Sequence, residues 1–180
     1  MLVTQADKPS AKKVCITGPE CTGKSELARF LAGHFNTFWI PEYARAYLDK
    51  LGHPYQESDL VKIAHGQLRL EEEWLREANR FMICDTNLIT IKIWSEFKYQ
   101  RCDSDILKKL QEQTYDLYLL CYIDVPWADD PQREHPDKRE YFWKRYQDEV
   151  MATGVPYVEI KGDWITRQQK AIAAINQQLS

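Results

Sequence analysis

The sequence has 180 residues, of which 44% are hydrophobic and 28% are charged, and this composition is typical of one folded domain with its own core. The formal net charge of −3 and the lack of any cluster of Lys and Arg argue against a nucleic-acid partner. No segment is apolar for long enough to span a bilayer, so we expect no membrane partner either.

The chain begins with a polar stretch, residues 1–12, in which we expect a disordered lead-in, and residues 13–180 are expected to form a single domain. The stretch lacks the apolar run of a signal peptide. The five cysteines are odd in number and include no Cys-x-x-Cys pair, which suits a reducing compartment better than a disulfide framework. We therefore expect a cytoplasmic protein.

Short apolar runs alternate with helical patterns along the rest of the chain. Strands are predicted at residues 13–17, 37–41, 80–84, 117–125 and 155–160. Helices are predicted at residues 25–35, 59–78, 87–97, 106–113, 141–151 and 165–179. Such alternation predicts an α/β fold, a parallel sheet with helices on both faces. In these sheets ligands bind where the strands end, so the residues just after each strand are the candidate site.

The first strand is followed by a run that fits the phosphate-binding loop pattern. The run consists of Gly18, Pro19, Glu20, Cys21, Thr22, Gly23, Lys24 and Ser25. Its backbone N–H groups would surround an anion at the start of the next helix. Lys24 would reach the β- and γ-phosphates and Ser25 would hold Mg²⁺, so we expect ATP and Mg²⁺ as cofactors.

The expected cofactor-binding run ends at Ser25, and the next residue, Glu26, is assigned no part in it. The alternative to a phosphate loop is a solvated glycine-rich turn. The strand before the run and the helix after it favour the phosphate loop.

Two carboxylates follow the second and third predicted strands. Glu42 is a candidate to accept the proton of an acceptor hydroxyl, and its alternative is a surface salt bridge with Arg45. Asp85 is a candidate to hold Mg²⁺ or contact the acceptor, and its alternative is to cap the following helix.

The segment at about residues 128–139 is charged and interrupted by prolines, which makes it a poor core element. We interpret it as a lid that excludes water from the reaction. Arg133 and Arg139 would then lie over the transferred phosphoryl group and act with Lys24, Glu42 and Asp85 in catalysis. The alternative is a solvated surface loop.

Taken together, these segments resemble the NadR-type ribosylnicotinamide kinase family of P-loop proteins. The resemblance rests on the phosphate loop, Glu42-Tyr43-Ala44-Arg45, Ile63-Ala64-His65-Gly66-Gln67, Asp85-Thr86-Asn87, and Asp124-Val125-Pro126-Trp127 with Asp130 and Arg133. It extends from about residue 13 to the end of the sequence. The ordered set is much more specific than the phosphate loop alone.

The resemblance implies that ATP phosphorylates the 5′-hydroxyl of nicotinamide riboside, a step of NAD salvage that yields nicotinamide mononucleotide. It also implies a three-layer α/β/α P-loop kinase fold with a five-stranded parallel sheet of order 2-3-1-4-5 and a mobile lid. The pyridinium of such an acceptor carries a positive charge, which favours aromatic faces and carboxylates. Tyr43, Trp94 and Trp127 are the aromatic candidates, and Tyr47 is a further candidate for the acceptor pocket.

Two residues depart from the family pattern: Cys21 stands where Ser is expected, and Asn87 where a second Asp is expected. Asn87 therefore removes one proposed carboxylate contact. Adenylyl transfer and DNA binding belong to other domains of multifunctional members and are not expected of these 180 residues.

Other functions remain open at this point. The acceptor could be another nucleoside or a nucleotide, although a monophosphate acceptor needs several cations and only Arg45 is well placed outside the lid. The chain could instead be a regulatory ATPase that transfers phosphate to water, or a nucleotide-binding switch or module without turnover.

Overall fold

The computed structural model describes residues 11–78 and 80–179. Ala11 is buried and the first strand, β1, comprises Lys12–Thr17, so the folded part includes two residues that the sequence places in the lead-in. The rest of the expected lead-in, residues 1–10, lies outside the described residues.

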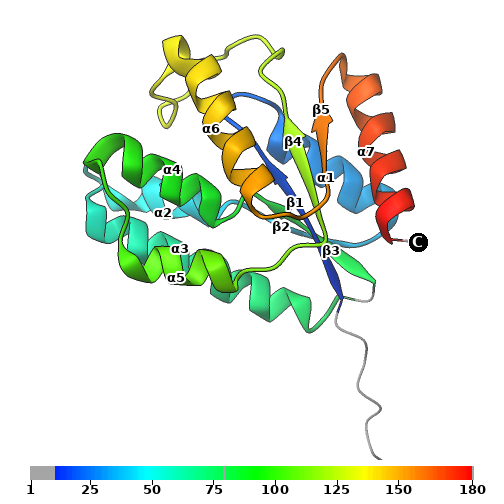
Figure 1. Ribbon diagram of the computed structural model, residues 1–180, viewed down its shortest axis with the longest axis horizontal. Helices are drawn as coiled ribbons and strands as arrows, with labels where there is room; N and C mark the ends of the chain where they lie inside the picture. Colours follow the sequence, from blue (N-terminus) through cyan, green and yellow to red (C-terminus); the bar gives the residue numbers. More distant parts are fainter. Residues whose placement is uncertain (1–10, 79, 180) are drawn as a thin grey trace, which may run out of the picture.

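A five-stranded parallel sheet forms the centre of the molecule, with the strand order β2-β3-β1-β4-β5 (Figure 1). The strands after β1 are β2 (Phe38–Ile40), β3 (Phe81–Asp85), β4 (Leu117–Cys121) and β5 (Tyr157–Ile160). Every residue of β3 and β4 is buried, as expected for strands covered by helices on both faces. The predicted sheet and its order are therefore confirmed.

Helices cover both faces of the sheet (Figure 1). On one face lie α1 (Lys24–Phe35) and α7 (Trp164–Leu179). Those on the other side are α2 (Tyr43–Leu51), α3 (Glu57–Leu75), α4 (Leu88–Tyr99), α5 (Ser104–Glu112) and α6 (Arg139–Ala152). A short 3₁₀ turn, η1 (Pro136–Lys138), precedes α6. This is the expected three-layer α/β/α architecture.

Successive residues of β1 serve different cores, because side chains alternate across a strand. Val14 and Ile16 pack with Leu27 and Leu31 of α1, whereas Cys15 packs on the opposite face with Ile89 of α4. A third cluster lies away from the sheet between helices α2, α3, α4 and α5, and it includes Leu60 and Ile106.

Most element bounds differ from the predicted ones by one to three residues, and three differences bear on the site. The nine-residue helix α2 was not predicted, since Ala44 is its only fully buried residue and it therefore carries little apolar periodicity. Strand β4 ends at Cys121, so Asp124 lies beyond the strand. Helix α6 begins at Arg139, which shortens the irregular part of the expected lid.

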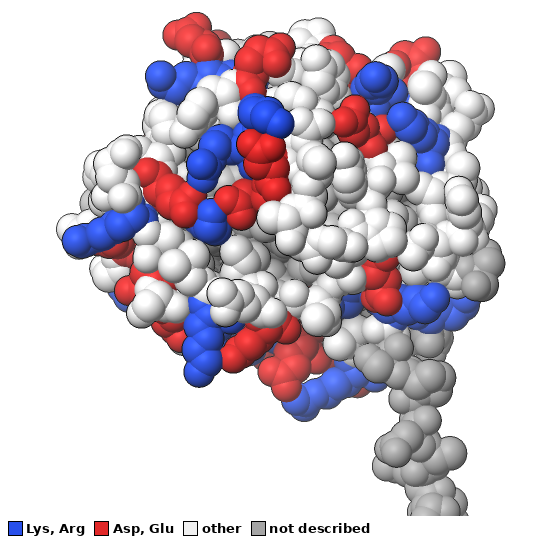
Figure 2. All heavy atoms as spheres, in the orientation of Figure 1, with Lys and Arg blue, Asp and Glu red and all other residues white. Residues whose placement is uncertain are grey.

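In the part of the chain that the structure describes, none of the helices is both long and apolar enough to cross a membrane. The face drawn in Figure 2 carries acidic and basic side chains close to one another and no extended area of one sign. All five strands run in the same direction, so their carboxyl ends meet at one edge of the sheet, where the candidate residues lie.

Candidate active site

The phosphate loop turns sharply between β1 and α1. Gly18 adopts a φ of +138°, and a Cβ atom at this position would lie 2.6 Å from the carbonyl oxygen of Cys121 in β4. Only glycine therefore fits at the start of the loop. The hydroxyl of Thr22 donates to the carbonyl of Pro19 over 2.9 Å and closes the loop on itself.

Lys24 stands at the first position of α1, with its ammonium inside the loop. Its Nζ donates to the carbonyl oxygen of Pro19 over 2.7 Å. The positive end of α1 and this ammonium face the same space, which suits an anionic group. The loop is also braced from outside by Arg167 of α7, whose Nη1 donates to the carbonyl of Thr22 over 2.9 Å. Sequence reasoning missed Arg167, because nothing in its local pattern sets it apart.

Asp85 ends β3 and is only 1% exposed. Its Oδ1 is buried without a hydrogen-bond partner among the described residues. Burial raises the pKa of this carboxyl, while the side chain of Ser25 and the charge of Lys24 lower it. The Asp85 carboxylate has an oxygen without a hydrogen-bond partner in the described part of the chain and lies close to the Ser25 hydroxyl. Mg²⁺ prefers oxygen ligands of these kinds, so the two residues fit the ion.

No group of three or more His, Cys, Asp or Glu side chains within residues 11–78 and 80–179 could hold a metal ion.

Helix α4 is capped by Asn87, not by Asp85. The Asn87 side chain accepts from the amide of Ile89 over 3.2 Å and donates to the Tyr118 hydroxyl over 3.0 Å. The alternative role of Asp85 as a helix cap is therefore wrong. Asn87 therefore has a structural role at the position where the sequence analysis expects a second Asp.

Glu42 occupies the N-cap position of α2, yet its side chain makes no capping hydrogen bond. Burial raises the pKa of Glu42 to about 7, against the lowering effect of Lys24, and Asp85 raises it further. The alternative of a salt bridge to Arg45 is not what the structure has, because the Arg45 guanidinium pairs with Asp130 at 3.0 Å. Glu42 is thus a half-buried carboxyl beside the phosphate loop.

The expected lid lies on the phosphate loop. The Nη2 of Arg139 donates to the carbonyl of Cys21 over 3.2 Å, and the amide of Ala128 donates to the Cys21 sulfur over 3.2 Å. The amide of Glu134 donates to Oε2 of Glu20 over 3.1 Å. These bonds place the segment against the phosphate loop while much of it stays exposed to solvent, and its role as a lid stays a prediction.

A second set of contacts joins the lid to α2. Beside the Arg45–Asp130 pair, Nε2 of Gln132 donates to Oδ1 of Asp49 over 2.6 Å and to the carbonyl of Arg45 over 3.2 Å. Arg133 donates to the carbonyl of Ala128 within the lid itself.

Two adjoining pockets open at this edge of the sheet. The phosphate pocket, about 390 Å³ in volume, surrounds the phosphate loop, and the aromatic pocket, about 400 Å³, lies under the lid. Four residues line both pockets, and they are Glu20, Trp94, Gln132 and Tyr146. A ligand in one pocket can therefore reach a ligand in the other.

The phosphate pocket brings together most of the predicted site residues. They include Lys24, Ser25, Glu42, Arg45 and Arg133. Glu26, to which the sequence assigns no part, also lines this pocket from the first turn of α1, where its side chain is exposed. Residues of the loop, α2 and the lid thus share one space.

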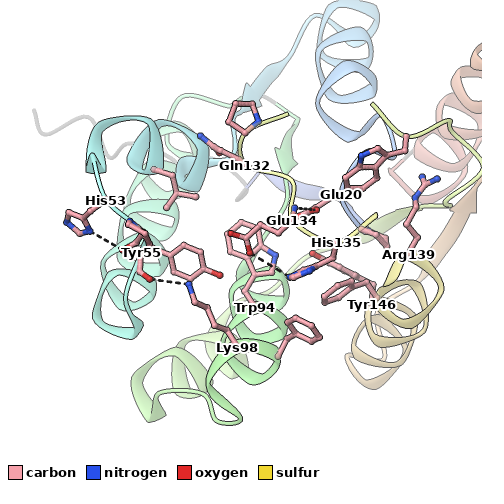
Figure 3. Close-up of a pocket in the computed structure, with 17 residues that line it drawn as sticks. Glu20, His53, Tyr55, Trp94, Lys98, Gln132, Glu134, His135, Arg139 and Tyr146 are labelled. Atoms are coloured by element: carbon pink, nitrogen blue, oxygen red, sulfur yellow. Dashed lines mark hydrogen bonds and ion pairs between the residues drawn. The ribbon is translucent and has the colours of Figure 1, made fainter. Parts of the chain in front are cut away.

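The aromatic pocket is walled by rings from the connection between α2 and α3, from α4, from residues 127–135 and from α6, and two carboxylates lie among them (Figure 3). Its rings belong to His53, Tyr55, Trp94, Phe97, Trp127, His135, Phe142 and Tyr146. The carboxylates are Glu20 and Glu134, and burial raises the pKa of Glu20. The Lys98 ammonium, which also lines the pocket, lies 3.5 Å from the centroid of the Tyr55 ring, so this ring already faces a cation of the chain.

Of the aromatic candidates, Trp94 and Trp127 line the aromatic pocket, whereas Tyr43 and Tyr47 line neither pocket. Tyr43 packs against α3, and the Tyr47 hydroxyl donates to Oδ1 of Asp59 over 2.8 Å. The expectation that both line the acceptor site is wrong, because α2 turns them toward α3.

The chain is similar to known proteins over most of its length. It is 31% identical over 140 residues to the trifunctional NAD biosynthesis/regulator protein NadR of Escherichia coli (strain K12), which covers 72% of this chain and 33% of that protein. The NadR of Salmonella typhimurium is 32% identical over 129 residues, or 68% of this chain and 31% of that protein. The chain thus spans about a third of the length of these relatives.

Solved structures share the fold. A NadR protein in complex with NR has a TM-score of 0.79 at 19% identity and covers 95% of this chain and 51% of its own. The thymidylate kinase of Ehrlichia chaffeensis has a TM-score of 0.65 at 14% identity. The match covers 93% of this chain and 100% of the thymidylate kinase chain. A family described as AAA domain matches residues 13–167. The chain therefore belongs to this AAA domain family, and its expected similarity to NadR-type P-loop kinases is confirmed.

Proposed function

We propose that the protein transfers the γ-phosphoryl group of ATP to a ribosyl hydroxyl of a nucleoside with a cationic aromatic base, namely nicotinamide riboside. The observation that carries the proposal is the aromatic pocket edged by Glu20 and Glu134, which adjoins the phosphate pocket. Its rings and carboxylates suit a pyridinium, and the shared wall brings the ribose toward the phosphate loop. The sequence relatives named for NAD biosynthesis support the same substrate.

The donor half of the reaction uses the phosphate loop. The backbone of residues 18–25 would hold the phosphates of ATP, with the Lys24 ammonium on the β- and γ-phosphates. Ser25 and Asp85 would hold Mg²⁺, which neutralises charge on the phosphates when bound.

The acceptor half uses Glu42, which lines the same pocket as Lys24. The 5′-hydroxyl oxygen bonds to the γ-phosphorus while the bond from that phosphorus to the bridging oxygen of ADP breaks. The hydroxyl proton passes to the Glu42 carboxylate, and ADP leaves with the bridging oxygen.

The lid would keep water from taking the place of the acceptor. Its contacts to Glu20, Cys21 and α2 cover the junction of the two pockets. Arg133 lines the phosphate pocket and Arg139 lines the adjoining aromatic pocket, which supports a role for both in phosphoryl transfer. All five cysteines are free thiols, which supports a cytoplasmic location.

The test is mass-spectrometric detection of product after incubation with ATP, Mg²⁺ and nicotinamide riboside. Other nucleosides, deoxynucleosides and nucleoside monophosphates are assayed in parallel. We expect nicotinamide mononucleotide to form at about 1 s⁻¹ or faster. Phosphorylation of a different acceptor alone would replace the substrate, and ADP without a phosphorylated acceptor would indicate a regulatory ATPase.

The control for this test is Lys24→Ala. We expect about 10²–10³-fold lower turnover, because one donor to the transferred group is lost. The variant should keep its circular dichroism and melting temperature, since the Lys24 ammonium hydrogen-bonds to Pro19 of its own loop and not to a distant element. Unchanged turnover would contradict the assignment of the phosphate loop.

A further inference from the structure

One motif of the resemblance has no place in either pocket. The residues Ile63, Ala64, His65, Gly66 and Gln67 lie on α3 and line neither the phosphate pocket nor the aromatic pocket. Two of them, Gly66 and Gln67, contact Tyr43, the residue directly after Glu42. The motif therefore acts on the start of α2 and not on a ligand.

Gly66 of α3 lets the ring of Tyr43, the first residue of α2, pack directly against the α3 backbone. A Cβ atom at Gly66 would lie 2.1–2.5 Å from carbon atoms of the Tyr43 ring, so the ring occupies the space that any other side chain would fill. Close approach of this kind fixes where α2 begins relative to α3.

Gln67 then caps α2. Its Oε1 accepts from the Tyr43 amide over 2.9 Å, and its Nε2 donates to Oε1 of Glu71 over 3.3 Å. Gln67 is 2% exposed, so neither bond can be exchanged for water at low cost. The amide of Tyr43 is one of the first N–H groups of a helix, which have no partner inside the helix.

Glu71 sets the orientation of the Gln67 amide. This carboxylate is 3% exposed and accepts from the Tyr115 hydroxyl at 3.0 Å, from Nε2 of Gln113 at 3.4 Å and from Nζ of Lys13 at 3.3 Å. Because a carboxylate only accepts, the NH₂ of Gln67 must face Glu71 and its oxygen must face Tyr43.

We propose that Gln67 is a positioning residue: it accepts from the Tyr43 amide, fixes the start of α2 and so holds the neighbouring Glu42 carboxylate in place for the acceptor hydroxyl. The catalytic part of this inference rests on the proposed function. Lys24, Asp85, Arg45 and Glu20 are the charged groups that act on Glu42 in this position.

The test compares Gln67→Ala with the matched control Gln113→Ala. Gln113 also donates to Glu71, but its Oε1 accepts from the amide of Leu88 at the start of α4. Removing the Gln113 side chain therefore breaks no hydrogen bond to α2. We expect Gln67→Ala to lower kcat by about 10²-fold through misplacement of Glu42, with the KM for ATP within about threefold. Gln113→Ala should retain the wild-type kcat. Equal kcat values for the two variants would overturn the proposal.

A double variant, Q67E with E71Q, tests the bonds themselves. The carboxylate at position 67 can still accept from Tyr43 and the amide at position 71 can donate to it, so the chain of bonds is rebuilt with reversed roles. We expect kcat to recover toward wild type, whereas Q67E alone faces the like charge of Glu71 and should not recover. Failure of the double variant to exceed Q67E would count against the assigned bonds.

A second readout separates this inference from the proposed function. Amide hydrogen exchange at Tyr43–Leu51 should accelerate in Gln67→Ala and stay unchanged in Gln113→Ala. If the wild-type protein phosphorylates no nucleoside, the proposed function is wrong. The hydrogen-exchange rate of α2 in Gln67→Ala still tests whether Gln67 holds the start of that helix. Unchanged exchange at α2 in Gln67→Ala would overturn the positioning role in either case.

Discussion

At the scale of single residues, the site depends on the Glu42 carboxyl, which is half-buried and makes no capping hydrogen bond to its own helix. Glu42 follows β2 at the N-cap position of α2, where its side chain makes no capping bond, and Gln67 holds the next residue by accepting from the Tyr43 amide. Burial then acts on Glu42 more strongly than Lys24 does, and its pKa rises to about 7. A carboxylate with a pKa near the working pH is deprotonated in a large share of the molecules and is still basic enough to take a proton.

This pKa predicts how activity depends on pH. A base works in its deprotonated form, so a raised pKa makes kcat/KM fall as the pH drops through about 7 and level off above it. We expect about tenfold lower kcat/KM at pH 6 than on the plateau, measured as product formed per unit time.

Glu42→Gln serves as the control for the pH profile. The amide cannot take the proton, so turnover should fall about 10²–10⁴-fold and the acidic limb should disappear. ATP affinity, measured by calorimetry, should change little. Lost ATP binding, or an acidic limb that persists in the variant, would contradict the role of Glu42.

At the scale of elements, the lid is held by contacts that can open. The Arg45 side chain is 48% exposed, and an exposed ion pair such as Arg45–Asp130 contributes about 0–1 kcal/mol. Three further hydrogen bonds join the lid to the phosphate loop, from Arg139 and Ala128 to Cys21 and from Glu134 to Glu20. Since substrate must enter beneath the lid, weak closing contacts suit a segment that opens in each cycle.

The lid arginines predict the strength of catalysis. Arg133 lines the phosphate pocket and Arg139 bonds to the Cys21 carbonyl of the phosphate loop, so Arg133→Ala and Arg139→Ala should each lower kcat. We expect the rate of phosphoryl transfer, measured by single-turnover kinetics, to fall about 10³-fold when the arginine that contacts the transferred group is replaced by alanine. ATP hydrolysis relative to transfer should rise in both variants.

Arg145→Ala is the matched control on the same helix. Arg145 pairs with Glu96 and Glu149 and lines neither pocket, so its loss should leave kcat unchanged. A similar loss of kcat in all three variants would mean that α6 matters only for the stability of the lid.

At the scale of the whole molecule, the edge of the sheet is tied together by Arg167. Its guanidinium donates to the carbonyls of Thr22 at 2.9 Å, Tyr122 at 3.0 Å and Gly162 at 2.9 Å, and it pairs with Asp124. One side chain of α7 thus joins the phosphate loop to the segments that follow β4 and β5. A buried cation with this many partners fixes the relative positions of three strand ends.

The contact of Gly18 with β4 predicts a difference between two glycines. Gly18→Ala should destabilise the fold by more than about 2 kcal/mol, because the new Cβ meets the Cys121 oxygen at 2.6 Å and φ is +138°. Thermal melting should show a midpoint lower by about 4–8 °C.

Gly33→Ala is the control for this prediction. Gly33 lies in α1, and a Cβ added there would meet no other part of the described chain within 4 Å, so alanine should stabilise by about 0.5 kcal/mol through helix propensity. A loss of stability at Gly33 as large as that at Gly18 would contradict the steric argument.

The sequence by itself determined what depends on neighbouring residues. The alternation of strands and helices, the phosphate loop, and the positions of Glu42 and Asp85 after their strands all follow from hydrophobic periodicity and short motifs. It could not predict α2, whose single fully buried residue leaves little periodicity to detect.

Only the tertiary structure decided which distant residues meet. Arg167 reaches Thr22 across 145 positions, and Gln67 reaches Tyr43 across 24. The walls of the aromatic pocket come together in the same way, from Tyr55, Phe97, His135, Phe142 and Tyr146. The physical reason is that local propensity fixes hydrogen bonding along an element, whereas these contacts depend on how elements pack, and packing is a property of the whole chain.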